Sequence, residues 1–249
     1  MGVETIEAQR QIQVVLYDLG GTLFHDDPAA WESIYRRADR ALWDSLHASG
    51  VRATPEILDA PADGLLDYYY QFRAAGMDEP GTARLLRVLL TKHGISFSES
   101  SLERALAAMY AVTQTNWFVE DDAVATLKRL RSAGIRQGVV SNGSDDANAR
   151  RLLEKGHLDP FFEIVLTSAA FGRRKPDPAI FRAALAQFGA APHESVMVGD
   201  DYGADIAGAR GIGMGTIWVT RRVPAAQVDA APRSEAKASC LAEIPALIV

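Results

Sequence analysis

Short apolar runs alternate with helical stretches through the second half of the chain. From about residue 121, a helical pattern over 121–133 leads to an apolar run over 137–141, and the alternation then continues. This alternation is typical of repeated strand–helix units that build a parallel sheet. The expected strands are Ile12–Asp18, Gln137–Ser141, Glu163–Thr167, Ser195–Asp200 and Gly215–Val219. A loop over 223–232 and a last helix over 236–248 are expected to close the chain.

Between the first strand and this block, the chain has helical periodicity and no convincing strand. Asp27 and Pro28 form a favourable helix start, and apolar residues then recur at helical spacing up to Gly50. Thr54–Pro55 predicts a further helix start, and Ser100 with Glu103 predicts a capping box. The segment is therefore expected to be a helical bundle.

Composition bounds the class of protein. The 249 residues are 48% hydrophobic with a formal net charge of −6, which allows a substantial core and argues against a nucleic-acid surface. The single cysteine, Cys240, excludes an internal disulfide. No stretch is long and apolar enough to cross a bilayer. We expect a cytoplasmic protein with neither nucleic-acid nor membrane partners; the oligomeric state is not readable.

Carboxylates follow two of the predicted strands directly. Asp18 ends the first apolar run before Gly20 and Gly21, and Asp200 ends another, with Asp205 following closely. Carboxyl ends of parallel strands meet at one edge of a sheet, which is where such sheets bind ligands. Carboxylate oxygens are the ligands that Mg²⁺ prefers. For Asp205, a helix cap is a competing interpretation.

Two further segments suit an anion. Ser141, Asn142 and Gly143 follow a predicted strand, so a hydroxyl and main-chain N–H groups can face a phosphate there. The stretch 175–181 places Lys175 in a proline-stiffened loop, and Asp177 caps the next helix. Alone, each segment would be an ordinary turn or surface lysine.

Together, the four segments resemble the haloacid dehalogenase-like hydrolase superfamily, in the same order along the chain. The resemblance implies a Rossmann-like parallel α/β core over 1–24 and 117–249, with an α-helical cap domain over 25–116. It also implies Mg²⁺-dependent chemistry through an aspartyl-phosphate. The implied roles are catalysis by Asp18, Ser141 and Lys175, substrate binding by Ser141, Asn142, Gly143 and Lys175, and metal binding by Asp18, Gly20 through its carbonyl, Asp200 and Asp205.

One position departs from the family's phosphatase pattern. Where that pattern has a second Asp, two residues after the nucleophile, as general acid and base, this chain has Gly20. The departure is compatible with a phosphatase in which His25, Asp26, Asp27 or water supplies the proton, or in which the leaving group needs none, as with an acyl phosphate.

Two further functions are compatible with Gly20. The first is a dehalogenase-like or phosphonatase-like hydrolase. Asp200 and Asp205 argue against the metal-free dehalogenases. The phosphonate-cleaving members form a Schiff base through a lysine of the cap, and the one lysine of the insert, Lys92, is poorly placed for this after a predicted buried helix face. The second is a weakened domain that binds a phosphorylated ligand or a protein partner. The leading prediction is a Mg²⁺-dependent phosphatase acting on a small phosphorylated metabolite.

Overall fold

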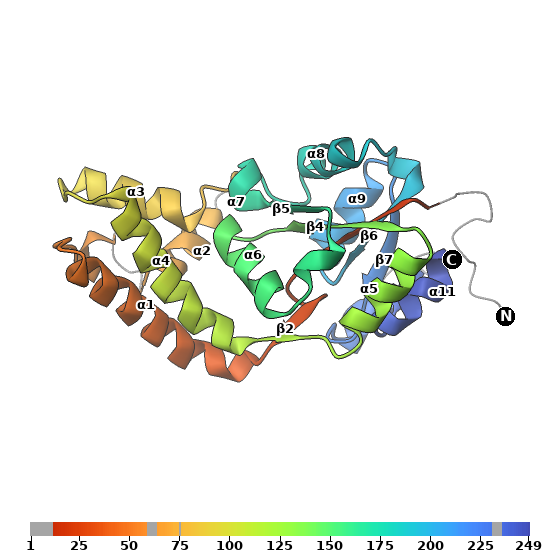
Figure 1. Ribbon diagram of the computed structural model, residues 1–249, viewed down its shortest axis with the longest axis horizontal. Coiled ribbons are helices and arrows are strands. Elements are labelled where there is room, and N and C mark those ends of the chain that lie inside the picture. Colours follow the sequence, from red (N-terminus) through yellow and green to blue (C-terminus); the bar gives the residue numbers. More distant parts are fainter. Residues whose placement is uncertain (1–11, 59–63, 75, 231–235) are drawn as a thin grey trace.

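A six-stranded parallel sheet forms the centre of the protein. The computed structural model describes residues 12–58, 64–74, 76–230 and 236–249. The strands lie in the order β5-β4-β1-β6-β7-β8, and every neighbouring pair is parallel (Figure 1). Their bounds are β1 Val14–Tyr17, β4 Arg136–Ser141, β5 Ile164–Thr167, β6 Ser195–Gly199, β7 Gly215–Val219 and β8 Ala236–Ala238.

Both faces of this sheet are buried, which explains the continuous apolar runs in its strands. Val15 and Tyr17 belong to one apolar cluster, together with side chains of α5, α6 and α11. Val14 and Leu16, which point to the opposite face, belong to a second cluster with side chains of α8 and α9. The helices of this part are α5 Ala123–Ser132, α6 Asp146–Lys155, α7 Ser168–Phe171, α8 Pro178–Phe188, α9 Gly208–Arg210, α10 Ala225–Ala230 and α11 Ile244–Ile248.

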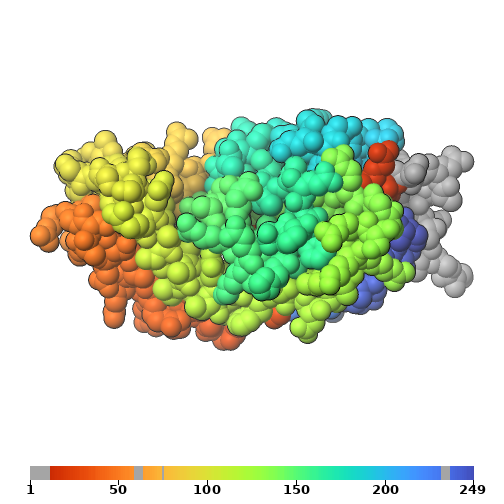
Figure 2. Space-filling model, in the orientation of Figure 1, coloured from red at the N-terminus to blue at the C-terminus, as the bar shows by residue number. Residues whose placement is uncertain are grey.

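Four helices between β1 and α5 form a separate bundle with its own apolar core. A 3₁₀ turn, Pro28–Ala30, precedes the first of these helices. Asp27 accepts a hydrogen bond from the Ala29 N–H, so the expected N-cap serves this turn, and the helix itself begins at Trp31. The bundle forms one end of the elongated molecule, orange and yellow in the space-filling view (Figure 2). We call it the helical insert; its helices are α1 Trp31–Ala48, α2 Leu65–Arg73, α3 Thr82–Lys92 and α4 Glu99–Thr113.

A short antiparallel ribbon links the insert to the sheet. It consists of β2 Phe24–Asp26 and β3 Trp117–Val119, with Asp26 opposite Trp117. The chain therefore enters and leaves the helical insert through neighbouring strands. Neither strand is evident in the sequence, because each has only three residues and its partner lies far along the chain.

Three local expectations were wrong. Residues 236–238 are a strand, because the edge of β7 supplies main-chain hydrogen bonds, and the last helix begins only at Ile244. The loop expected over 223–232 contains α10; residues 231–235 lie outside the described part. At α4, Ser98 and Ser101 form the capping box in place of Ser100 and Glu103.

A smaller difference concerns the segment after Gly50. Pro55 opens only a 3₁₀ turn, Pro55–Ile57, and not a full helix. Within the described ranges, no helix is both long and apolar enough to span a membrane. The cytoplasmic location stays a prediction.

Candidate active site

The parallel sheet brings the sequence-predicted residues to one cavity. Because β4, β1 and β6 are adjacent and parallel, the residues after their last positions lie at the same edge of the sheet. Lys175 reaches this edge from the loop before α8. The cavity has a volume of about 350 Å³, within the usual range for a ligand pocket. Its wall contains every predicted site residue: Asp18, Gly20, Ser141, Asn142, Gly143, Lys175, Asp200 and Asp205.

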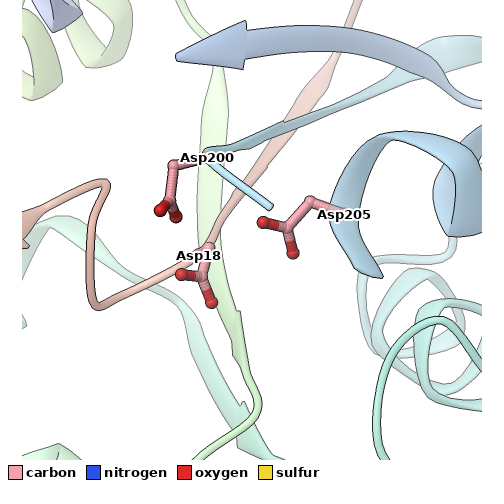
Figure 3. A group of neighbouring side chains, drawn as sticks. All are labelled: Asp18, Asp200 and Asp205. Carbon is pink, nitrogen blue, oxygen red and sulfur yellow. The ribbon is translucent and has the colours of Figure 1, made fainter. Parts of the chain in front are cut away.

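Three carboxylates gather at the floor of the cavity. One oxygen from each of Asp18, Asp200 and Asp205 lies within 4.8 Å of the other two, and the three carboxylates lie close together (Figure 3). Asp205 lies in a π-helical turn, Tyr202–Ala207, which starts soon after β6. A Cβ on Gly199 would lie 2.2 Å from Oδ2 of Asp205. A glycine at the end of β6 is therefore what admits this third carboxylate.

Lys175 is the counterion of this acidic cluster. Its buried Nζ lies 2.6 Å from an Asp18 oxygen and 2.6 Å from an Asp205 oxygen. Burial acts to lower the pKa of Lys175, but the charges of Asp18 and Asp205 outweigh it and raise that pKa overall. The lysine is therefore charged at neutral pH.

One cation does not balance the charge of three carboxylates, of which Asp18 and Asp205 are buried and Asp200 is partly buried. Burial, followed by the charge of Asp18, raises the pKa of Asp200 to about 7. Burial also raises the pKa of Asp205 to about 8, although Lys175 opposes the shift. An excess of negative charge in a desolvated place is the condition that a divalent cation relieves.

Asn142 positions Lys175 through its side-chain amide. Its Oδ1 accepts a hydrogen bond from the Lys175 N–H at 2.7 Å, and its Nδ2 donates to the Lys175 carbonyl at 3.0 Å. The sequence predicts substrate binding for Asn142. The structure engages its amide with the lysine loop, so the residue fixes where the ammonium group can reach.

The neighbouring residues on β4 and its loop complete this side of the cavity. Ser141 is the last residue of β4 and is 6% exposed. The carbonyl of Gly143 accepts hydrogen bonds from the Ala169 N–H and the Ser168 hydroxyl, each at 3.2 Å. These bonds tie the loop to α7.

Sequence reasoning missed two residues that orient Asp200. The Thr22 hydroxyl donates to its Oδ1 at 3.2 Å, and the Trp218 indole N–H donates to its main-chain carbonyl at 2.8 Å. Thr22 lies within the first motif, so its position was a usable signal. Trp218 lies in β7, and only the sheet order brings it to the site. Asp201, expected to be a solvated turn residue, is exposed and caps the next turn through Ala204 N–H.

Gly20 lies under an aromatic ring. A Cβ at this position would lie 2.9 Å from Cη2 and 3.2 Å from Cζ3 of the Trp117 indole. The side chain that Gly20 lacks would thus have to share its space with Trp117. No sequence pattern indicated this pairing, because Trp117 is on β3, at the far end of the helical insert.

The three polar residues considered as substitutes for the missing acid have other partners. His25 pairs with Glu120 at 3.3 Å, Asp26 accepts a hydrogen bond from the Trp31 indole, and Asp27 caps the turn that precedes α1. None of the three is part of the cavity wall, nor is Lys92 at the end of α3. The structure does not support an acid–base role for any of them.

Part of the cavity wall is aromatic. Trp31 stacks on Tyr35 with ring centroids 5.0 Å apart and meets Trp117 edge to face at 5.7 Å. Arg73 of α2 lies in the same wall and contacts the Asn142 carbonyl at 3.5 Å. The aromatic members of the wall are Trp31, Tyr35, Tyr69, Tyr70, Tyr110 and Trp117.

A parallel α/β sheet with an aspartate cluster and a buried lysine at its carboxyl edge defines a class of hydrolases. The chain belongs to the haloacid dehalogenase-like hydrolases, whose family description matches residues 12–213. It is 36% identical over 235 residues to a phosphoserine phosphatase of Thermus thermophilus, covering 89% of this chain and 94% of that relative.

Two other similar proteins extend the comparison. A glyceraldehyde 3-phosphate phosphatase of Pyrococcus furiosus is 27% identical over 209 residues, covering 84% of this chain and 81% of the relative. The solved structure of a 2-haloacid dehalogenase from Pseudomonas syringae has a TM-score of 0.67 and 26% identity, covering 95% of this chain and 98% of that chain.

Proposed function

We propose that the protein is a Mg²⁺-dependent phosphatase that acts on a small phosphorylated metabolite through an aspartyl-phosphate. The observation that carries the proposal is the pairing of Asp18 with Lys175 at 2.6 Å, beside two further carboxylates. Asp18 is the nucleophile, since its carboxylate lies in the cavity wall beside the Lys175 ammonium group, and a carboxylate placed there can attack phosphorus. The similarity to two named phosphatases supports this reaction over other hydrolyses.

The acidic cluster fits Mg²⁺. Its donors are hard carboxylate oxygens, and the single lysine leaves their charge in excess. Asp18, Asp200 and Asp205 would hold the ion, together with the main-chain carbonyl of Gly20. When bound, Mg²⁺ neutralises phosphate oxygens and makes phosphorus more electrophilic.

The remaining site residues hold the phosphoryl group. Ser141 supplies a hydroxyl, Gly143 its main-chain N–H, and the Lys175 ammonium group a positive charge for the equatorial oxygens. Asn142 contributes main-chain N–H and fixes the lysine loop. In this arrangement residues 1–24 and 117–249 act as the catalytic core, and residues 25–116 act as a cap that excludes water and contacts the leaving group.

Phosphate release by the native protein and by Asp18→Asn tests this proposal. The panel contains phosphoserine, glyceraldehyde 3-phosphate, acetyl phosphate and 4-nitrophenyl phosphate, each with and without Mg²⁺. We expect Mg²⁺-dependent release that falls by about 10⁴-fold or more in Asp18→Asn, since a nucleophile has been removed. Asp44→Asn, a change at an exposed carboxylate of α1, is the matched control.

Failure of the native protein to release phosphate from any substrate would overturn the proposal. If the inactive protein still had a higher melting temperature in the presence of Mg²⁺ and inorganic phosphate, that result would indicate a binding domain. A melting temperature of Asp18→Asn close to the native value excludes misfolding as the cause of lost activity.

A second candidate is hydrolysis of a carbon–halogen bond. The structural similarity to a 2-haloacid dehalogenase and the missing second Asp at Gly20 favour it. Halide release from a 2-haloacid without Mg²⁺ would support this reaction. Release of phosphate but no halide would exclude it.

A further inference from the structure

The space beside Gly20 is closed to an acid–base group. The tip of the Trp117 indole lies where a side chain on Gly20 would extend. The ring is held on two sides: its strand pairs with β2 at Asp26, and Trp31 meets it edge to face at 5.7 Å. A bound water or carboxylate could occupy this place only if the ring moved.

The two other carboxylates of the cavity wall act as N-caps of the helical turns that follow them. Besides the three metal-site residues, the wall contains Asp145 and Asp201. Asp145 accepts a hydrogen bond from the Asn148 N–H at 2.7 Å, and Asp201 accepts one from the Ala204 N–H at 2.9 Å. Each carboxylate is committed to a cap, so neither is positioned as the missing acid.

The buried tyrosines of the wall are poor proton donors. Burial raises the pKa of Tyr69 and of Tyr110 far above the ordinary tyrosine value. The Tyr69 hydroxyl also donates to Glu79 at 2.9 Å, away from the carboxylate cluster. Neither these two tyrosines nor the two capping carboxylates are therefore positioned to protonate a leaving group.

We propose that this site takes phosphorylated compounds whose leaving group is flat and apolar and departs as a stable anion, without a proton from the protein. The inference rests on the proposed phosphatase reaction. Two kinds of compound share this chemistry: phosphate esters of phenols and mixed anhydrides of phosphate with aromatic carboxylic acids. Trp117 is a specificity-determining residue in this proposal.

The reaction steps balance without an enzyme acid. An Asp18 oxygen forms a bond to phosphorus, the bond from phosphorus to the leaving oxygen breaks, and that oxygen keeps the electron pair as phenolate or carboxylate. Water then attacks phosphorus, the bond to Asp18 breaks, and the proton of the water passes to phosphate or solvent. Because the missing group would also have served as the base for this water, the second step is slow.

The aromatic wall suits the leaving group. Trp31, Tyr35 and Trp117 line the cavity and contact one another in sequence, Tyr35 to Trp31 to Trp117, and planar rings pack well against aromatic surfaces. Arg73 in the same wall brings positive charge toward a developing anion. An aliphatic zwitterion such as phosphoserine matches this wall poorly.

The decisive experiment is a series of phenyl phosphates of similar shape, with ring substituents that lower the pKa of the phenol step by step. We expect native kcat/KM to rise close to tenfold for each unit of fall in that pKa, since an unprotonated leaving group carries its full charge. A burst of about one phenolate per active site, before slow turnover, is expected from the slow second step.

Variants at Gly20 and Trp117 test whether these residues cause the steep dependence of kcat/KM on leaving-group pKa. Gly20→Asp combined with Trp117→Ala supplies both an acid and room for it, so the dependence on leaving-group pKa should flatten severalfold. Trp117→Ala alone, the matched control, should keep the steep dependence. Asp145→Asn, which retains a cap acceptor, should keep it as well; a shallow dependence in the native protein that steepened in Asp145→Asn would assign the acid to Asp145 and overturn the proposal.

Further substrates separate phosphate esters of phenols from mixed anhydrides, and separate a failure of this inference from a failure of the phosphatase proposal. The ratio of kcat/KM for benzoyl phosphate to that for acetyl phosphate tests the aromatic wall, because the two leaving groups have similar basicity. The ratio of kcat/KM for benzoyl phosphate to the values for the phenyl phosphates shows whether the site prefers an anhydride or an ester. Values of kcat/KM that are independent of leaving-group pKa, with kcat/KM for phosphoserine equally high, would refute this inference and leave the phosphatase proposal intact. Absence of release from every substrate would refute the phosphatase proposal itself.

Discussion

A side chain on Gly21 would collide with the carboxylate of Asp200: a Cβ built there lies 2.2 Å from Oδ2 and 2.4 Å from Cγ. Gly21 also has φ of +81°, a backbone conformation that favours glycine. The turn after β1 thus passes close enough for the neighbouring Thr22 to reach the Asp200 carboxylate. The position of a candidate metal ligand depends on a residue with no side chain.

Gly21→Ala is expected to lower stability and to weaken Mg²⁺ binding. Gly50→Ala is the matched control, because Gly50 has φ of +80° with no atom within 4 Å of its added Cβ. Backbone strain alone should cost about 1 kcal/mol in each variant. Urea unfolding and Mg²⁺ titration should show an additional loss in Gly21→Ala. Equal losses in stability and unchanged Mg²⁺ affinity would contradict the importance of this contact.

Mg²⁺ binding is expected to strengthen as pH rises from 6 to 8. The pKa values of Asp200 and Asp205, raised to about 7 and about 8, leave these groups partly protonated in the metal-free protein at neutral pH. Since the metal binds the ionised forms, it must displace protons. Mg²⁺ affinity should therefore rise up to about tenfold for each unit of rise in pH and for each proton displaced. Calorimetry in buffers of different ionisation enthalpy measures the protons released.

Asp201→Asn is the control for that titration, because asparagine retains an acceptor for the helix cap. It should leave the pH dependence unchanged. An affinity independent of pH, with no proton release in the native protein, would show that the carboxylates are already ionised at pH 6.

Lys175→Met should reduce stability at pH 7 more than at pH 5. The raised pKa of Lys175 means that the lysine is charged at pH 5 and at pH 7 alike, and that its contribution to stability is lost only as pH rises through that raised pKa. Without the lysine, the positive charge that opposes protonation of Asp200 and Asp205 is gone, and a buried charge left without its partner costs about 3–5 kcal/mol. At pH 5, below the raised pKa values of both groups, these two carboxyl groups are protonated and the penalty shrinks. Urea unfolding at both pH values tests this.

Lys128→Met changes an exposed lysine of α5 and controls for loss of charge alone. It should have little effect at either pH. An equal loss in Lys175→Met at pH 5 and pH 7 would point to lost packing, and not to the carboxylates.

Glu79 joins the helical insert to the sheet domain. Its buried carboxylate accepts hydrogen bonds from Tyr69 at 2.9 Å and from Ser168, at the start of α7, at 3.0 Å. Glu79→Ala leaves both hydroxyls without this acceptor and should lower stability by about 2–4 kcal/mol. Since Tyr69 lines the cavity, KM should rise as well.

A double-mutant cycle with Ser168→Ala measures this link directly. The combined variant should lose less stability than the sum of the single variants, because both remove one shared hydrogen bond. Strict additivity would mean that Glu79 and Ser168 do not interact energetically.

The sheet could be predicted from sequence because its strands are buried on both faces. Such strands appear as continuous apolar runs, and all five expected strands are present. The short strands β2, β3 and β8 could not be predicted, since three residues carry too little pattern and their pairing depends on distant partners. Likewise, local turn chemistry alone did not distinguish Ser98 from Ser100 as the cap of α4.

The sequence by itself determined the chemistry available at the sheet edge. Asp18, Ser141 and Asp200 end strands that are predicted to be parallel, and parallel strands end at one edge regardless of the details of packing. That rule is enough to predict the cluster and its order along the chain.

Only the tertiary structure decided which side chains complete the cavity wall around that cluster. Trp117 covers Gly20, and tyrosines of the insert complete the wall; these contacts join residues far apart in the chain and leave no periodic signal. The physical reason is that strand register follows from local hydrophobic pattern, whereas the placement of an inserted bundle follows from the packing of specific side chains across its interface.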